Sequence, residues 1–453
     1  MKKTHVCVAM LGIGLLAPTV LTGCDQTKAP EQQKVVKLMF LNEENYRREY
    51  ANIVEYKFPE LKIEIVPYTE LMQPGKQTIK SYIEFMNLHK PDIITILPIP
   101  GLFDALIQGG YLLALDPYIA KHRFDLDQYA PLVTKLLRDK GQGNVYGLPP
   151  SFSTNALYYN KDLFDKLKIE YPLGSMSFKD VFDLAYRFAQ QGNGEPIVGF
   201  YMKNTTPRSF LRYVGNMEGL QWTDAAGRSM TIQTSAWEKA FTTVIDAYRS
   251  GAMFDASLLE TQLQNNEWRR NYEAVIEEAR KSSLFANGKA AMTIDSPLLI
   301  NDIKRLQPDM NWDLVSLPSH GGPIPSEYVN FQTIHAISSG TSLAEESWNA
   351  VELLHSDQVE KTNASIYGLL FNRLPVRMKN IVYLQPKNFE AFYTLETEEK
   401  GVAEALTPAG VNKLVEQLVP DLLDNKLSVS DALRIIQEQG NALLLQDREA
   451  QDE

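Results

Sequence analysis

The chain alternates apolar runs with amphipathic stretches, and this pattern constrains its fold more than any other feature. Residues 35–41 (VVKLMFL) predict a buried strand, residues 62–68 (KIEIVPY) a half-buried strand, and residues 93–97 (IITIL) a third strand. Helical patterns at 42–58 and 72–88 separate these strands. Strands that alternate with helices of this length are typical of βαβ units, so the sequence predicts an α/β fold with a mainly parallel sheet.

The rest of the chain continues the mixed pattern. Further strands are predicted at 196–200, 290–294, 312–317 and 333–338, and further helices at 160–168, 177–190, 236–249, 265–287, 343–355, 357–365, 408–419 and 428–445. A glycine-rich break at 141–147 precedes an extended segment, Val145–Leu148, that we interpret as a crossing between domains. A chain of 453 residues is too long for one simple core, so we expect two lobes.

The N-terminal segment has the layout of an export signal. Lys2 and Lys3 precede an apolar run from Val6 to Val20, which is shorter than the ~20 apolar residues of a membrane-spanning helix. Leu-Thr-Gly-Cys, ending at Cys24, resembles the lipobox of bacterial lipoproteins. The resemblance implies a signal peptide at 1–23, acylation of Cys24, and a polar tether at 24–34. The protein would then be lipid-anchored to the cell membrane on its extracytoplasmic face. The alternative is an ordinary secretion signal.

Composition excludes several classes of function. The formal net charge is −11, which disfavours binding to nucleic acid. Cys7 and Cys24 are the only cysteines, so the body after residue 24 has neither a disulfide framework nor a thiolate metal site. The six histidines are far apart in the sequence, and common hydrolase and nucleotide-binding motifs are absent. We therefore predict no enzyme activity, no catalytic residues, no metal site and no cofactor.

Several motif blocks occur in a fixed order along the body. They are Gly147-Leu148-Pro149 with Ala156-Leu157-Tyr158-Tyr159-Asn160-Lys161-Asp162-Leu163-Phe164, then Ser177-Phe178-Lys179-Asp180, Gly288-Lys289-Ala290-Ala291-Met292, Ala344-Glu345-Glu346-Ser347-Trp348 and Leu374-Pro375-Val376-Arg377. Together they resemble the family-1 extracellular solute-binding proteins of bacteria. These are the binding subunits of carbohydrate ABC importers, a family that includes maltose-binding protein. The resemblance covers residues 35–445.

This resemblance implies a two-lobed fold, of the type II periplasmic-binding-protein kind, that closes on a ligand about a hinge. We expect residues 35–148 and 296–345 in the N-terminal lobe, and residues 149–295 and 346–450 in the C-terminal lobe. Binding residues are expected on loops at the carboxyl ends of strands, where the cleft between the lobes would lie. A single closing cleft needs no partner subunit, so a monomer is expected.

Candidate ligand contacts in the N-terminal lobe and the crossing follow predicted strands. Asn42 and Glu44 follow the first strand, where they either contact ligand hydroxyls or serve the N-terminus of a helix. Pro98 follows the third strand at the expected cleft edge. Ser151, Phe152 and Thr154 follow the crossing, a stretch that reaches the ligand in the resembled family. Phe152 would stack on a sugar or lie in the core.

The other candidate contacts lie beyond residue 200. They are Trp222, Asp295, Ser296, Tyr328, Asn330, Tyr367 and Arg373. Trp222, in a turn-rich loop, would stack on a sugar or anchor its loop. Arg373 would bind an acidic sugar through a bidentate pair or cap a helix, and the cap is slightly favoured. The resembled family often has Gly-x-Trp where this chain has Asp295-Ser296-Pro297-Leu298, so a maltodextrin type of pocket is not expected.

The resemblance favours capture of a sugar or oligosaccharide and its delivery to the permease subunits of an ABC importer. A second hypothesis keeps the fold but assigns a non-sugar solute, such as a polyamine or a metal chelate. A third hypothesis is a lipoprotein enzyme that acts on polysaccharides. The chemistry of the pocket decides among the three hypotheses.

Overall fold

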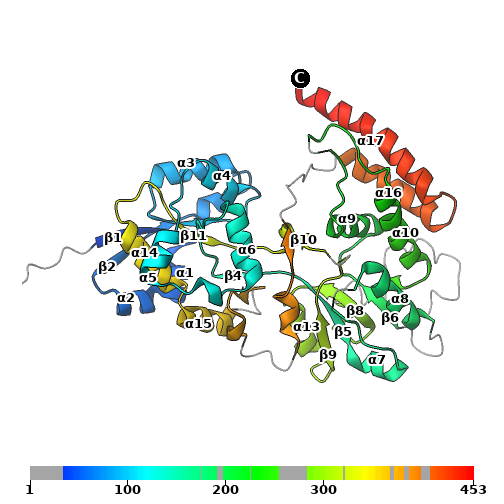
Figure 1. Cartoon of the computed structure of the whole chain (residues 1–453), viewed down its shortest axis with the longest axis horizontal. Coiled ribbons are helices and arrows are strands. Elements are labelled where there is room, and N and C mark those ends of the chain that lie inside the picture. The colour runs from blue at the N-terminus through cyan, green and yellow to red at the C-terminus, as the bar shows by residue number, and fades with distance from the viewer. Residues whose placement is uncertain are drawn as a thin grey trace, which may run out of the picture.

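The chain folds into two lobes that lie side by side and are joined by extended segments (Figure 1). The computed structural model describes residues 34–174, 176–190, 197–224, 226–254, 283–319, 322–367, 372–381, 387–398 and 409–452. The predicted signal peptide, Cys24, nearly all of the tether and most of the predicted helix at 265–287 therefore lie outside the described residues. Within the described part, no helix is long and apolar enough to cross a membrane.

A four-stranded sheet forms the centre of the first lobe. Its strand order is β11-β3-β1-β2, with bounds β11 Ile334–Ile337, β3 Ile93–Ile96, β1 Lys34–Phe40 and β2 Leu61–Pro67. β1 pairs in parallel with β2 and β3, whereas β11 is antiparallel to β3. β1, β2 and β3 confirm the strands predicted at the start of the chain. Their parallel pairing places the loops that follow them at one edge of the sheet.

A five-stranded sheet forms the centre of the second lobe. Its order is β7-β6-β8-β5-β9, with bounds β7 Met253–Phe254, β6 Val198–Tyr201, β8 Ala290–Asp295, β5 Ala156–Asn160 and β9 Trp312–Val315. β6 is parallel to β7 and β8, and β5 is antiparallel to β8 and β9. Asp295 at the end of β8 pairs with Ala156 at the start of β5, so both residues lie at the end of the sheet where the chain enters from the first lobe.

Helices cover both sheets. In the first lobe they are α1 Glu43–Tyr46, the π-helix η1 Arg47–Ala51, α2 Asn52–Lys57, α3 Ile79–His89, α4 Leu102–Gln108, α5 Asp116–His122, α6 Pro131–Lys140, α14 Ala344–Leu354 and α15 Asp357–Tyr367. In the second lobe they are α7 Lys161–Leu167, α8 Phe178–Ala189, α9 Pro207–Met217, α10 Ser235–Arg249, α13 Leu299–Leu306, α16 Ala409–Leu423 and α17 Val429–Asp452.

Local sequence signals explain where several helices begin. Ser177 and Asp180 form a capping box that starts α8, and Pro131 occupies the first turn of α6. The helix predicted at 72–88 begins later, at Ile79, because Thr78 is its N-cap and accepts a hydrogen bond from the Ser81 backbone. Helix starts could thus be predicted wherever a capping side chain stands before an apolar stripe.

Four of these elements lie in the opposite lobe from the one that the sequence analysis assigned. β9 and α13 were assigned to the N-terminal lobe but lie in the second lobe, where β9 pairs with β5. α15 and most of α14 were assigned to the C-terminal lobe but lie in the first lobe, where α14 packs on β1 and β11 and buries Trp348 in the first core. These four assignments are wrong. A short apolar strand does not specify which sheet edge it joins, because pairing is decided by contacts with residues far away in the sequence.

Candidate functional site

Extended segments at 148–153 and 329–333 cross between the lobes and pair with each other, and the extended segment 372–375 pairs with the first of them. Leu148 and His335 exchange backbone hydrogen bonds of 2.9 Å, and Ser153 and Asn330 exchange bonds of 2.8 Å. β12 (Leu374–Pro375) pairs with β4 (Ser151–Phe152) in the same region. This paired bundle of extended backbone is the hinge of the molecule, and hinge closure needs only a few such residues.

Gly147 lets the crossing segments approach each other. A Cβ atom at this position would lie 2.5 Å from Cγ2 of Ile334 and 3.0 Å from the carbonyl oxygen of His335. No side chain fits there unless the neighbouring strand moves. The glycine of the Gly-Leu-Pro motif therefore has a structural role at the hinge.

The carboxyl ends of β1, β2 and β3 form the first-lobe wall beside the hinge. Asn42 follows β1 and caps α1, because its side-chain oxygen accepts hydrogen bonds from N and Nδ2 of Asn45 at 2.9 and 2.8 Å. Glu44 is exposed in the first turn of α1, and Pro98 is exposed after β3. The helix-terminus interpretation of Asn42 is thus confirmed, while ligand contacts by these residues stay predictions.

The π-helix η1 carries two side chains that the sequence analysis did not single out. Tyr50 is buried, packs edge-on against Phe40 with ring centroids 5.7 Å apart, and lines a small pocket at the hinge. The Glu49 side chain is 12% exposed, and Arg48 Nη2 lies 3.9 Å from its carboxylate. Within the described part of the chain no hydrogen bond reaches that carboxylate. π-helical turns frequently occur at functional sites because they alter which side chains share a face.

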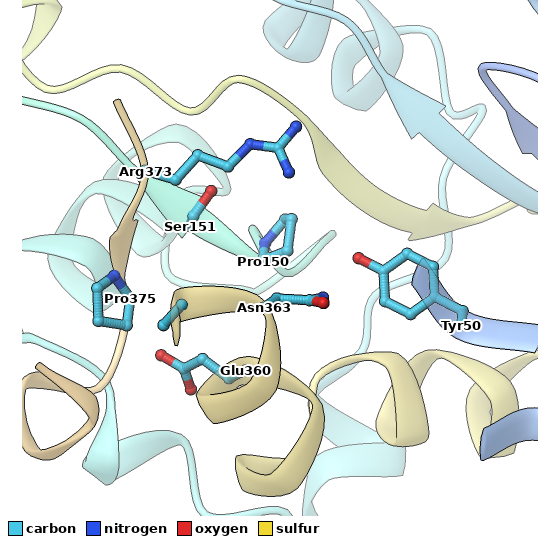
Figure 2. A pocket seen from close by; sticks show the side chains of 8 residues that line it. Tyr50, Pro150, Ser151, Glu360, Asn363, Arg373 and Pro375 are labelled. Carbon is cyan, nitrogen blue, oxygen red and sulfur yellow. The ribbon is translucent and has the colours of Figure 1, made fainter. Parts of the chain in front are cut away.

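Arg373 lies at the centre of the hinge. Its Nε donates to Oε1 of Gln332 at 3.2 Å, so segments 329–333 and 372–375 are joined by their side chains as well. The pocket beside it is lined by Tyr50, Pro150, Ser151, Glu360, Asn363, Ala364, Arg373 and Pro375. Figure 2 shows the Arg373 guanidinium on the same side of this pocket as the Ser151 hydroxyl. The pocket holds about 20 Å³, which is room for one water molecule.

Electrostatic coupling places Glu49, Tyr68 and Arg373 in one cluster. Burial raises the pKa of Glu49, and the positive charge of Arg373 works in the opposite direction. Burial also raises the pKa of Tyr68, which follows β2, to about 12, with Glu49 adding to the rise and Arg373 opposing it. We call Glu49, Tyr50, Tyr68, Gln332 and Arg373 the hinge cluster. It gathers a carboxylate, a guanidinium, an amide and two buried phenols where the extended segments meet.

The second-lobe wall is built at the end of β8. Burial raises the pKa of Asp295, and Lys203 opposes that rise. The backbone N–H of Ser296 donates to Oδ1 of Asp295 at 2.7 Å, and the Tyr158 hydroxyl donates to the Ser296 carbonyl at 2.9 Å. Thr154 is buried, and its hydroxyl has no hydrogen-bond partner among the described residues. Asp295, Ser296 and Thr154 thus lie at the hinge end of the second sheet.

The remaining candidates near the hinge differ in exposure. Tyr328 is partly buried and meets the Tyr213 ring edge-on at 5.3 Å. Asn330 is exposed and lies on the crossing segment that pairs with Ser153. Tyr367 is the last residue of α15, and its side chain lies outside the described residues. Their ligand contacts stay predictions.

Two aromatic residues predicted to stack on a ligand are buried instead. Phe152 is 0% exposed and packs edge-on against Tyr393 at 5.1 Å, so its ring fills the core of the hinge. Trp222 is 7% exposed and packs against Trp237 at 4.9 Å in the second core. The stacking interpretation of both residues is wrong, because apolar neighbours cover the faces that a sugar would need. For each, the packing alternative is confirmed.

Sequence reasoning missed Glu49, Tyr50, Tyr68, Lys203 and Gln332. Tyr68 is the last residue of one predicted strand and Lys203 follows another, so the rule that ligands bind at the carboxyl ends of strands could have found them. Glu49 and Tyr50 lie inside a helical stretch, and nothing in their spacing distinguishes a π-turn from an α-helix. Among the described residues, no group of three or more histidine, aspartate or glutamate side chains could hold a metal ion.

Comparison with protein families decides what kind of molecule carries this hinge. The family model described as bacterial extracellular solute-binding protein matches residues 50–355, which is more than half of the chain. The chain belongs to this family. The solute-binding family assigned from the motif blocks is therefore confirmed, and so is the two-lobed α/β fold.

Solved structures of solute-binding proteins share the fold. An extracellular solute-binding protein of family 1 from Alicyclobacillus acidocaldarius matches with a TM-score of 0.64 and 14% identity, covering 90% of this chain and 98% of that one. A sugar transporter from Rhizobium etli in an open conformation matches with a TM-score of 0.59 and 17% identity, covering 90% and 99%. At these identities the likeness establishes the fold and not the solute.

Curated relatives match part of the chain. A candidate binding protein of Brucella abortus is 26% identical over 300 residues, which cover 65% of this chain and 64% of that protein. The sn-glycerol-3-phosphate-binding periplasmic protein UgpB of the same organism is 23% identical over 234 residues, covering 50% of this chain and 45% of UgpB. The chain thus spans less than two thirds of the length of these curated relatives.

Proposed function

We propose that this protein captures a sugar or oligosaccharide between its lobes outside the cytoplasm and delivers it to the permease subunits of an ABC importer. The observation that carries this proposal is the hinge cluster, which gathers polar side chains and tyrosine rings where the lobes meet. Sugar sites combine hydrogen-bonding groups for hydroxyls with aromatic surface for C–H faces. Lobe closure would bring the second-lobe wall, with Asp295 and Ser296, towards this cluster.

Each polar group of the hinge cluster has a defined part in the proposal. The Glu49 carboxylate accepts hydrogen bonds from sugar hydroxyls, which supply the donors that this buried carboxylate needs. Arg373 donates to hydroxyl oxygens and opposes the cost of burying Glu49. Tyr50 and Tyr68 orient the sugar. From the sequence prediction, Asn42, Glu44, Pro98, Ser151, Thr154, Tyr328, Asn330 and Tyr367 stay proposed contacts.

The proposed cellular setting rests on the N-terminal sequence. Acylation of Cys24 would anchor the protein to the cell membrane, since each buried CH₂ group of an acyl chain adds ~0.8 kcal/mol of membrane affinity. The polar tether would let the body reach its permease while remaining a monomer. The extracellular character of the family supports this placement. No catalytic step is assigned to the chain.

A phosphorylated polyol is the second candidate solute. The similarity to UgpB favours it, and so do the two cationic side chains, Arg373 and Lys203, that act on the walls of the space between the lobes. Arginine binds phosphate through a bidentate pair. A polyamine fits this arrangement less well, because Arg373 would repel it from Glu49.

A thermal-shift screen of residues 25–453 tests the proposal and discriminates among the candidates. The panel contains mono- and oligosaccharides, uronates, sn-glycerol 3-phosphate, polyamines and metal ions. A solute that binds only the folded state raises the melting temperature by mass action, and we expect a neutral sugar to do so. A shift with sn-glycerol 3-phosphate alone would transfer the assignment to the second candidate. Shifts with polyamines or metals alone would contradict both.

A further inference from the structure

Two histidines make direct contact in the core of the first lobe, behind the hinge cluster. Nδ1 of His335, on β11, lies 3.1 Å from Nε2 of His355, which ends α14. His335 is 1% exposed and His355 is 2% exposed. Such a contact requires a hydrogen on one nitrogen and a lone pair on the other. The pair therefore accommodates one added proton at most, because two imidazolium rings would direct N–H groups at each other.

Charged and titratable groups surround the pair, and the two arginines among them oppose its protonation. Those that face it are Tyr50 from η1, Tyr129 from the segment before α6, Arg373 from segment 372–375, and Arg377 after β12, whose charge is shared with Glu360 of α15. The Tyr129 hydroxyl lies 3.4 Å from Nδ1 of His355, and the Arg377 guanidinium lies 4.7 Å from the Tyr129 ring centroid. The Glu360 carboxylate is bound by Arg377. Even so, the Arg373 charge lowers the pKa of His335 and the Arg377 charge lowers that of His355.

The histidine pair touches the binding machinery on two sides. The backbone of His335 is hydrogen-bonded to Leu148 at 2.9 Å in both directions, which holds crossing segment 148–153 against β11. The His335 ring meets the Tyr50 ring edge-on with centroids 6.5 Å apart, and Tyr50 lines the pocket beside Arg373. Displacement of the His335 ring would therefore change both the hinge pairing and the position of a cleft aromatic residue.

Burial and the arginines also shift the titration of both rings. Burial lowers the pKa of His335 to about 4, with Arg373 adding to the effect. Burial lowers the pKa of His355 well below its usual value, with His335 and Arg377 adding to it. An exposed histidine titrates near pH 6.5, so between about pH 4 and 6.5 a conformation that exposes His335 binds more protons than one that buries it. The conformation with His335 buried is thus fully stable above about pH 6.5, and its stability falls as the pH falls through this window.

We infer that the His335–His355 contact is a positioning element of the hinge, which holds segment 148–153 and Tyr50 in their binding geometry and releases them on acidification. Neither histidine touches the solute, and both act through Leu148 and Tyr50. The consequence for solute affinity rests on the proposed function, whereas the consequence for the hinge itself does not. Binding would be strongest at neutral pH and would weaken in an acidified extracellular space.

Hydrogen exchange of the full chain, read by mass spectrometry without any solute, tests this inference. We expect protection in peptides that contain Leu148 and His335 to fall at least about tenfold between pH 7 and pH 4.5, after correction for intrinsic exchange rates. In His355→Gln, which hydrogen-bonds but does not titrate at position 355, the fall in corrected protection should be smaller, because only His335 remains to bind a proton. Peptides from α8 in the second lobe serve as the internal reference.

An identical pH profile in the wild type and His355→Gln would overturn the inference. If His355→Gln does not fold, imidazole NMR of the wild type decides instead: both rings should titrate well below pH 6.5, and the Leu148 amide should shift with the same midpoint. Imidazole rings that titrate near pH 6.5, or a Leu148 amide whose chemical shift does not change as the rings titrate, would equally overturn the inference.

A second experiment measures the affinity of the wild type and of His355→Gln for maltotriose and for sn-glycerol 3-phosphate, at pH 7 and at pH 4.5. Glu49 also titrates in the cleft, so only the difference between the wild type and His355→Gln reports on the pair. The affinity of the wild type should fall at least about tenfold more than that of the variant. Equal losses in both proteins would overturn the link between the pair and binding. Failure of both solutes to bind would count against the proposed function and leave the hinge result standing.

Discussion

Arg373→Ala should weaken solute binding about 100-fold, equivalent to about 2.7 kcal/mol. The guanidinium lies where crossing segments meet, donates to Gln332, and opposes the burial cost of Glu49. Its removal takes away a charged donor and leaves the Glu49 carboxylate in a partly buried site without its main counter-charge. Arg373→Lys should recover part of the affinity, because it keeps the charge but not the planar fork. Isothermal titration with the solute that raises the melting temperature measures both effects.

Matched variants separate a binding role from a general loss of charge or packing. Arg305→Ala removes an exposed arginine that pairs with Asp302 on α13 and should leave affinity unchanged. Trp222→Phe alters a tryptophan that packs in the second core and should also leave affinity unchanged. Wild-type affinity in Arg373→Ala would show that the hinge cluster does not bind the solute.

Arg377→Met should lower the free energy of unfolding by about 3–5 kcal/mol, because it breaks a buried ion pair. The Arg377 and Glu360 side chains are 5% and 4% exposed, and Arg377 also donates to the carbonyl of His355 at 3.1 Å. Without Arg377 the carboxylate of Glu360 keeps its burial cost and loses its partner. Urea denaturation at pH 7 measures the change.

A neighbouring pair on the surface provides the control. Lys379 and Asp357 lie 3.1 Å apart and are each 51% exposed, so Lys379→Ala should cost less than about 1 kcal/mol. The loss in Arg377→Met should also shrink in acid. Burial already raises the pKa of Glu360 in the folded protein. A group with a raised folded-state pKa contributes stability in acid, and that stability is lost as the pH rises through the raised pKa. In acid the protonated Glu360 therefore no longer needs the positive charge of Arg377. Equal costs for Arg377→Met and Lys379→Ala would contradict the burial argument.

The fold could be predicted from the sequence where the signals are local. The apolar runs that became β1, β2, β3, β6, β8, β9 and β11 are short, bounded and correctly located. The Gly-Leu-Pro motif marks the hinge because Gly147 has no room for a side chain. Lobe membership was harder to predict. β9 and α14 joined sheets that their own sequences do not specify, since those contacts involve residues distant in the chain.

The candidate site could be predicted only in part. Ser151 was placed at the cleft because of its position in the resembled family, and Arg373 because it lies between predicted helices, and they do line one pocket. Glu49 and Tyr50 were not found, because a π-turn leaves no clear mark on residue spacing. Phe152 and Trp222 were misjudged because an aromatic residue in a turn-rich segment has the same appearance in sequence whether its ring is exposed or packed.

Small-angle X-ray scattering of the body with and without the solute found in the screen tests the central claim most directly. If the protein captures its solute by closing two lobes about the hinge, the radius of gyration should fall when the wild type is saturated. Arg373→Ala at the same solute concentration should show little change. An unchanged radius of gyration in the saturated wild type would contradict capture by lobe closure.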